Sequence, residues 1–76
     1  MSDLEWMKMF GDNLKDIMKD VGITQRELAD ETGLTEACIS YYVNGQRMPS
    51  VKAIINIGYA LNCSEDDLIS FMDKIE

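Results

Sequence analysis

The segment that most constrains the fold of this chain is TQRELADETGLTEACISYYVNGQRMPS, which spans residues 24–50. It opens with Thr24 followed three residues later by Glu27, the pattern of a capping box at the start of a helix. Gly33 then stands where a helix end favours a left-handed residue. The pattern therefore predicts a short helix over about residues 25–32 that Gly33 ends.

A second short helix is expected directly afterwards. Thr35 offers an N-cap, and the helix over about residues 36–43 runs into Asn44-Gly45, two residues that tolerate positive φ. Because only turn residues separate the two helices, they must cross at a steep angle and share one apolar seam. The residues expected in that seam are Leu28, Ala29, Leu34, Ile39 and Tyr42.

This order of residues resembles the lambda repressor/Cro-type helix-turn-helix family, also called the XRE family. A plain antiparallel pair of capped helices would share the caps and the periodicity, but not the whole set of landmarks. The resemblance covers roughly residues 10–69 and implies an all-α, five-helix, lambda-repressor-like DNA-binding domain. The matching landmarks are Gln25, Leu28, Ala29, Gly33, Ile39, Ser40, Gly45, Pro49, Ser50, Ile57, Ala60, Leu61 and Leu68.

Helices are also expected on both sides of this pair. Apolar residues at spacings of three and four predict a helix from Met9 to Val21, with Gly22 as its stop. Ser50 caps a helix that reaches about Leu61 and is apolar on more than one stripe, which is typical of a helix with two neighbours. A last helix is predicted over about residues 65–75. Residues 1–76 thus form a single five-helix domain in this interpretation.

Size and composition favour one small soluble domain. With 76 residues, 46% of them hydrophobic, the chain suffices for one core. No apolar run approaches the ~20 residues that cross a bilayer, and the N-terminus lacks a basic signal region, so we expect a cytoplasmic protein without a membrane anchor. Cys38 and Cys63 show no metal-ligand spacing and there is no His. We expect both cysteines to be small buried side chains, with Cys38 on the second motif helix the more exposed of the two. We expect no metal, no cofactor and no catalytic residue.

The resemblance implies that the second motif helix enters the major groove of double-stranded DNA. Its base-contacting positions are Glu36, Ala37, Ser40 and Tyr41. Glu36 suits the cytosine amino group and Ala37 a thymine methyl, while Ser40 and Tyr41 are adaptable. Two alternatives remain open: Glu36 is an ordinary carboxylate at a helix start, and Tyr41 is a half-buried packing residue.

The same resemblance implies contacts to the DNA backbone from both sides of the second helix. Gln25 matches a glutamine at the start of the first motif helix, where its amide faces a phosphate or, alternatively, braces the two helices. The full set of expected backbone contacts is Gln25, Thr35, Asn44, Gln46, Arg47 and Lys52.

Charge weakens the case for DNA binding, because counterion release by Lys and Arg supplies much of its free energy. The chain has a net charge of −7. Residues 24–52 hold three basic and four acidic side chains, whereas residues 53–76 hold one and five. The acid is thus concentrated away from the expected DNA-binding face, which predicts weak non-specific binding and offers a surface for a protein partner.

Two positions depart together from the family. Many members carry an Arg on the first helix and a Glu late in the second motif helix that form an ion pair, and the matching positions here are Met18 and Val43. Replacing both charges by apolar residues can be neutral, whereas losing one leaves a buried charge unpaired. We therefore expect Met18 and Val43 to touch.

Self-association is expected to use apolar residues near the two ends of the chain. If they do not cover one another, they form an exposed patch suited to a homodimer. The alternative is that the N-terminal arm packs on the last helix within one monomer. The residues concerned are Leu4, Trp6, Met7, Met9, Phe71, Met72 and Ile75.

Together these observations predict a sequence-specific DNA-binding transcriptional regulator of the repressor or Cro-like type carried by prophages and mobile elements. The chain leaves no room for a separate sensor domain in this interpretation. The alternative is a protein-binding helix-turn-helix module, such as an antitoxin or anti-repressor, that uses its acidic surface. An enzyme is not expected, because no residue pattern supports acid-base chemistry.

Overall fold

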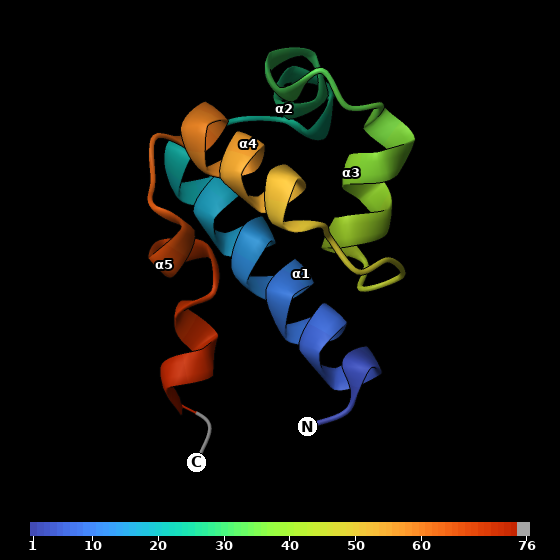
Figure 1. Cartoon of the computed structure of the whole chain (residues 1–76). Coiled ribbons are helices and arrows are strands. Elements are labelled where there is room, and N and C mark those ends of the chain that lie inside the picture. Colours follow the sequence, from blue (N-terminus) through green and yellow to red (C-terminus); the bar gives the residue numbers. More distant parts are fainter. Residues whose placement is uncertain (75–76) are drawn as a thin grey trace.

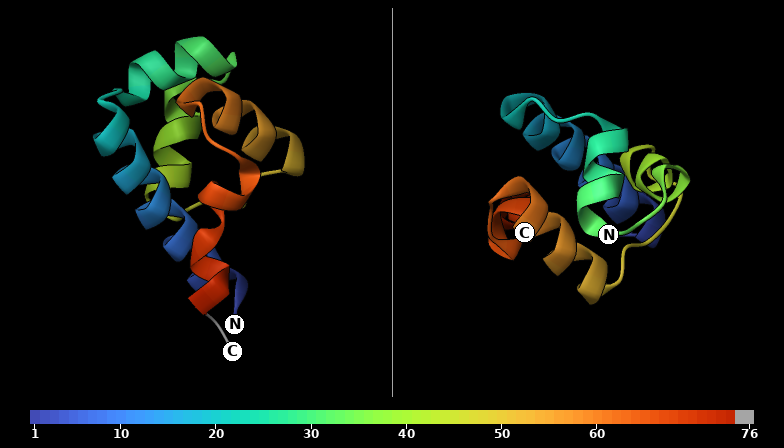
Figure 2. Two further views of the ribbon diagram at one scale, coloured as in Figure 1. Left: turned by 90° about the vertical axis from the view of Figure 1, so that its left-hand side faces the viewer. Right: turned by 90° about the horizontal axis from the view of Figure 1, so that it is seen from above.

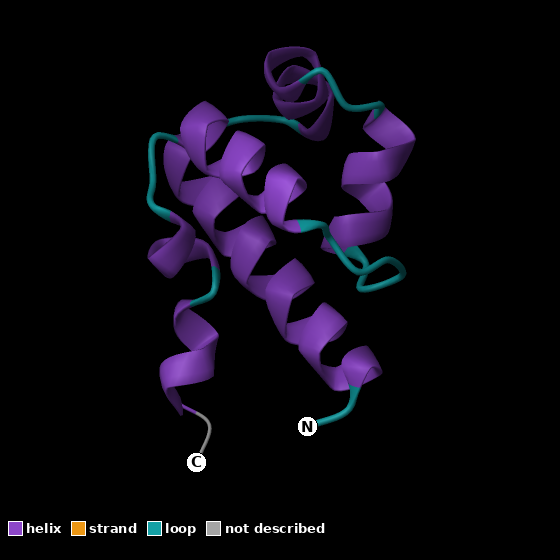
Figure 3. Cartoon of the chain, viewed as in Figure 1, coloured by secondary structure: helices purple, strands orange, loops and turns teal. Residues whose placement is uncertain are grey.

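The chain folds into helices alone within residues 1–74, the part whose backbone a computed structural model describes; side chains are described for residues 1–72. Figure 3 shows helices joined by short loops. The all-α, five-helix prediction is confirmed. The elements are α1 (Asp3–Val21), α2 (Gln25–Thr32), α3 (Glu36–Val43), α4 (Val51–Leu61), α5 (Glu65–Leu68) and a 3-10 turn (Ser70–Lys74).

The long helix α1 packs against α3, α4, α5 and the 3-10 turn, whereas α2 packs against α3 and α4 (Figure 1). In this view α1 runs behind α4, while α2 and α3 lie at the top and the right, and α5 and the 3-10 turn lie along the other side of α1. The views in Figure 2 show the described ends of the chain at the same end of the molecule. One core joins all five helices and the 3-10 turn. Its buried side chains are Phe10, Leu14, Met18, Leu28, Ala29, Ile39, Tyr42, Val43, Ala53, Ile57, Leu61, Leu68 and Phe71.

The first helix begins at Asp3, so the prediction of a start at Met9 is wrong. Ser2 caps it: the Glu5 backbone N–H donates to the Ser2 hydroxyl over 3.2 Å, and the Glu5 carboxylate accepts from the Ser2 backbone N–H over 3.5 Å. The apolar periodicity of the chain is clear only from Met9 onward, and the Ser2–Glu5 capping box was the signal that could have extended the helix. The residues expected to form an N-terminal arm are the first turns of α1.

The last helix is much shorter than predicted, because α5 ends at Leu68 and Ile69 leaves the helical region with φ −111°. The chain continues as the 3-10 turn. Asn13 of α1 explains the break, since its side-chain amide donates to the backbone carbonyls of Asp67 and Leu68 at the end of α5. The predicted Ile75 lies outside the described residues.

Aromatic side chains join the start of α1 to the 3-10 turn. The Trp6 ring stacks on Phe10 with a centroid distance of 5.4 Å and meets Phe71 edge-on at 5.4 Å. These residues therefore cover one another within one monomer. This agrees with the alternative in which the N-terminal residues pack on the last part of the chain. Leu4 and Met72 stay exposed, at 67% and 45%.

Two further expectations concern packing. Met18 and Val43 are both buried in the common core, and their direct contact stays a prediction. Both cysteines are half-buried, so the prediction of burial is wrong for Cys63 and also for Cys38, which was expected to be the more exposed of the two. Burial raises the pKa of the Cys63 thiol, and the nearby carboxylates of Asp67 and Glu65 raise it further.

The helices α1 and α3 approach each other backbone to backbone at Gly11. A Cβ atom placed on Gly11 would lie 2.5 Å from the Val43 carbonyl oxygen and 2.6 Å from that of Tyr42. Because these are main-chain atoms at the end of α3, they cannot turn aside as a side chain does. The absence of a side chain at Gly11 thus sets the distance between α1 and α3.

Gly11→Ala is expected to destabilise the protein by about 1–3 kcal/mol, the usual cost of overpacking a core. The sign of the change in the free energy of unfolding is diagnostic, because Gly→Ala in an open helix interior stabilises a protein by roughly 1 kcal/mol. Urea unfolding measures the change, and Asp12→Ala at the neighbouring exposed position is the control. A Gly11→Ala variant as stable as the parent would contradict the close approach.

Phe71→Ala is expected to cost about 3 kcal/mol, because it removes a buried ring, and to shift the fluorescence emission of Trp6 to the red, because that indole loses its cover. Trp6 is the one tryptophan of the chain, so the signal is unambiguous. Met72→Ala, at the exposed neighbour, should change neither the stability nor the emission. Unchanged emission in Phe71→Ala would mean that the two rings do not touch.

Candidate nucleic-acid interface

Short-range capping builds α2 and α3 as the sequence predicts. Thr24 and Glu27 form the reciprocal capping box at the start of α2, and Gly33 ends that helix in the left-handed region with φ 76°. The Thr35 hydroxyl accepts from the Cys38 backbone N–H over 3.0 Å and so caps α3. After α3 the left-handed residue is Gly45, with φ 70°, whereas Asn44 keeps a negative φ.

The predicted seam between the two motif helices is confirmed. Leu28 and Ile39 are fully buried, Ala29 and Tyr42 are buried, and Leu34 packs half-buried against the same core. Thr32 reinforces the turn, because its hydroxyl donates to the Leu28 carbonyl over 2.8 Å and accepts from the Leu34 backbone N–H over 3.3 Å. The seam fixes which face of α3 points inward.

The opposite face of α3 is open to solvent. Ile39, Tyr42 and Val43 point into the core. The four predicted base-contacting residues lie on the other side of the helix, where Glu36, Ala37 and Tyr41 are exposed and Ser40 is half-buried. Tyr41 is 42% exposed, so it lies at the surface and not in the core.

Two contacts tie the predicted backbone-contacting residues to this face. The Asn44 amide donates to the Ser40 hydroxyl over 3.3 Å. The Arg47 guanidinium carbon lies 4.8 Å from the centre of the Tyr41 ring, a cation–π geometry. Arg47 also donates to the Cys38 sulfur over 3.9 Å. The contact of Cys38 with Arg47 could not be predicted from local spacing, because it depends on how the loop after α3 folds back.

The remaining predicted backbone contacts are placed separately around α3. Gln25 is half-buried at the first residue of α2, and Gln46 and Lys52 are exposed in the loop after α3 and at the start of α4. Thr35 is exposed, but its hydroxyl oxygen already accepts the capping hydrogen bond. Its hydroxyl hydrogen is still free to donate to a phosphate.

Tyr42 is the titratable group most strongly affected by this arrangement. Burial raises the pKa of Tyr42 to about 12, with a further rise from a hydrogen bond to Cys38 and from the charge of its thiolate, and a smaller opposing effect of Arg47. A raised pKa of an acid means that the folded state holds the proton longer than the unfolded state, whose tyrosine titrates near 10. The stabilising effect is complete below pH 10 and is lost as the pH rises towards 12.

Tyr42→Phe is therefore expected to lose part of the alkaline destabilisation seen in the parent. Stability should fall between pH 10 and pH 12 in the parent, and less steeply in Tyr42→Phe. Thermal unfolding at several pH values measures this, with Tyr59→Phe at an exposed position as the control. Equal pH dependence in parent and Tyr42→Phe would contradict the raised pKa.

Two features are absent from the part of the chain that the structure describes. Within that part of the chain, no helix is both long and apolar enough to cross a bilayer. Nor do any three His, Cys, Asp or Glu side chains among the described residues gather where they could hold a metal ion.

Two capped helices that cross on a shared seam, with the outer face of the second left open, define a helix-turn-helix protein. Residues 14–68 match the family model HTH_3, described as helix-turn-helix, and the chain belongs to this family. The resemblance noted from the sequence is thereby confirmed.

Relatives with known names agree with this assignment. The chain is 39% identical over 61 residues to the uncharacterized HTH-type transcriptional regulator YqaE of Bacillus subtilis, covering 80% of this chain. It spans 53% of that relative's length. It is also 25% identical over 71 residues to the uncharacterized HTH-type transcriptional regulator y4dJ of Sinorhizobium fredii, covering 93% of this chain and 92% of y4dJ.

Solved structures share the fold. The restriction-modification controller protein C.AhdI of Aeromonas hydrophila superposes with a TM-score of 0.80 at 27% identity, over 82% of this chain and 94% of that one. The clp gene regulator ClgR of C. glutamicum superposes with a TM-score of 0.82 at 25% identity, over 93% of this chain and 94% of that one.

Proposed function

We propose that this protein is a DNA-binding transcriptional regulator that inserts α3 into the major groove. The observation that carries the proposal is the open outer face of α3 on a helix-turn-helix scaffold whose inner face is fully used by the core. The names of its relatives support the same class, since both are described as HTH-type transcriptional regulators. A small cytoplasmic repressor of the Cro-like, mobile-element type is the form of regulator that we infer.

In this proposal the bases are read by four side chains of α3. Glu36 accepts from a cytosine amino group, Ala37 contacts a thymine methyl, and Ser40 donates or accepts. Tyr41 reaches the groove with its hydroxyl while Arg47 holds the ring from one side. None of the four is a bidentate Arg, Asn or Gln, so DNA shape and the spacing of two half-sites supply the rest of the specificity.

The DNA backbone is held from both ends of the recognition helix. Arg47 brings a positive charge to the edge of α3, because its contact with Tyr41 keeps it beside the base-reading face. Gln25 adds its amide and the free backbone N–H groups at the start of α2. The complete set of proposed phosphate contacts is Gln25, Thr35, Asn44, Gln46, Arg47 and Lys52.

The net charge of −7 restricts the salt concentrations at which DNA binding can be detected. Few Lys and Arg side chains contact phosphates, so non-specific affinity is low and specific binding is strongest at low salt. One domain reads only a few base pairs, and we infer that two copies bind a two-fold symmetric operator.

Selection from a pool of random duplex DNA at low salt tests the proposal. The parent is expected to enrich a palindromic site, and the double variant Gln25→Ala, Tyr41→Ala is expected to enrich none. If the parent enriches nothing, DNA binding fails as the function, and the protein-binding alternative with its acidic surface takes its place.

Single variants at Arg47 and Tyr41 separate phosphate contacts from base contacts. Arg47→Ala is expected to weaken binding to all sequences and to reduce the slope of log affinity against log salt by about one. Because Arg47 also holds the Tyr41 ring, the change in slope is the readout that is specific to the phosphate contact. Tyr41→Ala is expected to leave that slope unchanged and to relax the preference at one base pair, by about 1–3 kcal/mol. Fluorescence anisotropy with the selected duplex measures both.

Lys15→Ala is the matched control for Arg47→Ala, because it removes an exposed positive charge from α1. It should leave the affinity almost unchanged. An equal loss in Lys15→Ala and Arg47→Ala would show that net charge, and not the geometry at α3, controls binding.

A further inference from the structure

Arg47 is held against the recognition helix by two contacts from α3. One of its terminal nitrogens, Nη1, lies 3.9 Å from the Cys38 sulfur and donates to it. Its guanidinium carbon lies 4.8 Å from the centre of the Tyr41 ring. Cys38 and Tyr41 are three positions apart on α3, so they lie on the same side of the helix, one turn apart. The loop after α3 thus places a positive charge on two neighbouring side chains.

Cys38 joins this surface contact to the core. Its side chain is half-buried and packs against the buried residues of the core. It also shares a hydrogen bond with Tyr42, one turn further along α3, whose side chain is buried. Burial is the largest cause of the raised pKa of Tyr42, this hydrogen bond adds to the rise, and the charge of Arg47 opposes it. The Cys38 sulfur therefore connects a buried hydroxyl to an exposed guanidinium.

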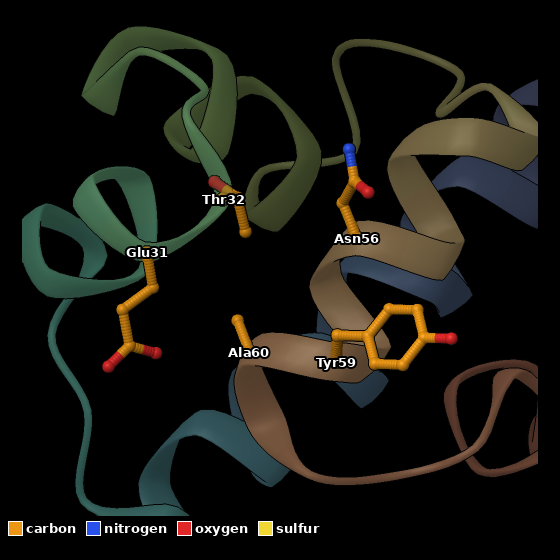
Figure 4. Close-up of a pocket in the computed structure, with 5 residues that line it drawn as sticks. All are labelled: Glu31, Thr32, Asn56, Tyr59 and Ala60. Atoms are coloured by element: carbon orange, nitrogen blue, oxygen red, sulfur yellow. The ribbon is translucent and has the colours of Figure 1, made fainter.

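An exposed tyrosine ring on this protein does not by itself hold a cation. Tyr59 of α4 is 83% exposed, against 42% for Tyr41. Figure 4 shows its ring pointing away from Glu31 and Thr32, at a groove of about 340 Å³ between α2 and α4. The five residues that line this groove include no Arg or Lys. What Tyr41 has in addition is the Cys38 sulfur on the same helix, which gives a guanidinium on its ring a second contact.

The contact with sulfur leaves the guanidinium able to bind an anion. Arg has five N–H donors in a planar fork, and the contact with Cys38 occupies one of its nitrogens. Arg47 is exposed, and a phosphate accepts two parallel N–H bonds from such a fork. Because sulfur is a weak acceptor, a phosphate can displace it at little cost.

We propose that Cys38 is a positioning residue for DNA binding, whose sulfur keeps the Arg47 guanidinium beside the base-reading face of α3 before DNA arrives. The proposal rests on the proposed function, because it names what places one phosphate contact of that same face. A long Arg side chain loses conformational freedom when it binds, and holding it in advance removes part of that loss. Cys38 acts through Arg47 and needs no contact of its own with DNA.

NMR relaxation without DNA tests whether the sulfur holds Arg47. The chain has two arginines, so the heteronuclear Overhauser effect at their side-chain Nε–H groups gives one signal for Arg47 and one for Arg26, an exposed residue of α2. The parent is expected to show a rigid Arg47 and a mobile Arg26. Cys38→Ala should lower the value for Arg47 towards that of Arg26. Cys38→Ser keeps an acceptor atom and should preserve it.

Two variants serve as controls. Cys63→Ala removes the other half-buried thiol, and Tyr59→Ala removes the exposed ring of Figure 4. Both residues lie at or beyond the last turn of α4, whereas Arg47 precedes its first turn. Neither variant should change the signal of Arg47. Circular dichroism confirms that each variant stays folded.

Fluorescence anisotropy with the selected duplex tests the effect on DNA binding. Cys38→Ala is expected to raise the Kd roughly two- to ten-fold, the cost of ordering one long side chain. The slope of log affinity against log salt should stay unchanged, because Arg47 still meets its phosphate. Cys38→Ser should bind within about two-fold of the parent. Adding Cys38→Ala to Arg47→Ala should cause no further loss, since the two residues act as one unit.

Three results would overturn the proposal: an Arg47 signal that Cys38→Ala leaves unchanged, a Cys38→Ala variant that binds DNA as tightly as the parent, or an equal loss from Cys38→Ala in the parent and in Arg47→Ala. A parent that enriches no duplex in the selection would instead remove the proposed function. The relaxation measurement, which contains no DNA, still decides in that case whether Cys38 holds Arg47.

Discussion

The arrangement of this protein depends on the close approach of α1 to the end of α3. Gly11 lets α1 lie directly against the carbonyls of Tyr42 and Val43, and Gly45 lets the following loop lie against the backbone of Lys8. A side chain at either position would meet main-chain atoms. The end of α3 is thereby anchored through the backbone, and its outer face needs no part in holding it in place. Because the backbone holds α3 in place, its outer residues Glu36, Ala37, Ser40 and Tyr41 are available for a ligand.

The sequence predicted local features well and long-range ones poorly, for a physical reason. The caps at Thr24, Thr35 and Ser50 and the left-handed Gly33 depend on residues three or four apart, so they can be read directly from the chain. The end of α5 is held by a hydrogen bond from Asn13, which lies more than fifty positions earlier in the chain. A contact over that separation cannot be predicted from local spacing. The candidate site divides in the same way. Its exposed face follows from the seam opposite, whereas the contact of Arg47 with Tyr41 depends on the path of the loop.

The outer face of α3 and the outer side of α4 differ in charge and in shape. The base-reading face of α3 is almost uncharged apart from Glu36 and the adjacent Arg47, so binding there depends on fit more than on electrostatic attraction. The outer side of α4 exposes Val51 and Tyr59 beside the charged Lys52. In the proposed function the outer face of α3 selects the DNA, and the acidic remainder of the chain limits binding to the wrong sequences.

Binding of DNA by α3 is tested by following the backbone amide NMR signals of the protein while the selected duplex is added. The largest chemical-shift changes are expected on the outer face of α3 and at the start of α2, around Gln25 and Tyr41. The signals of the acidic segment from Glu65 to Asp67 should move little. Large changes confined to that segment, with α3 unaffected, would contradict DNA binding by α3.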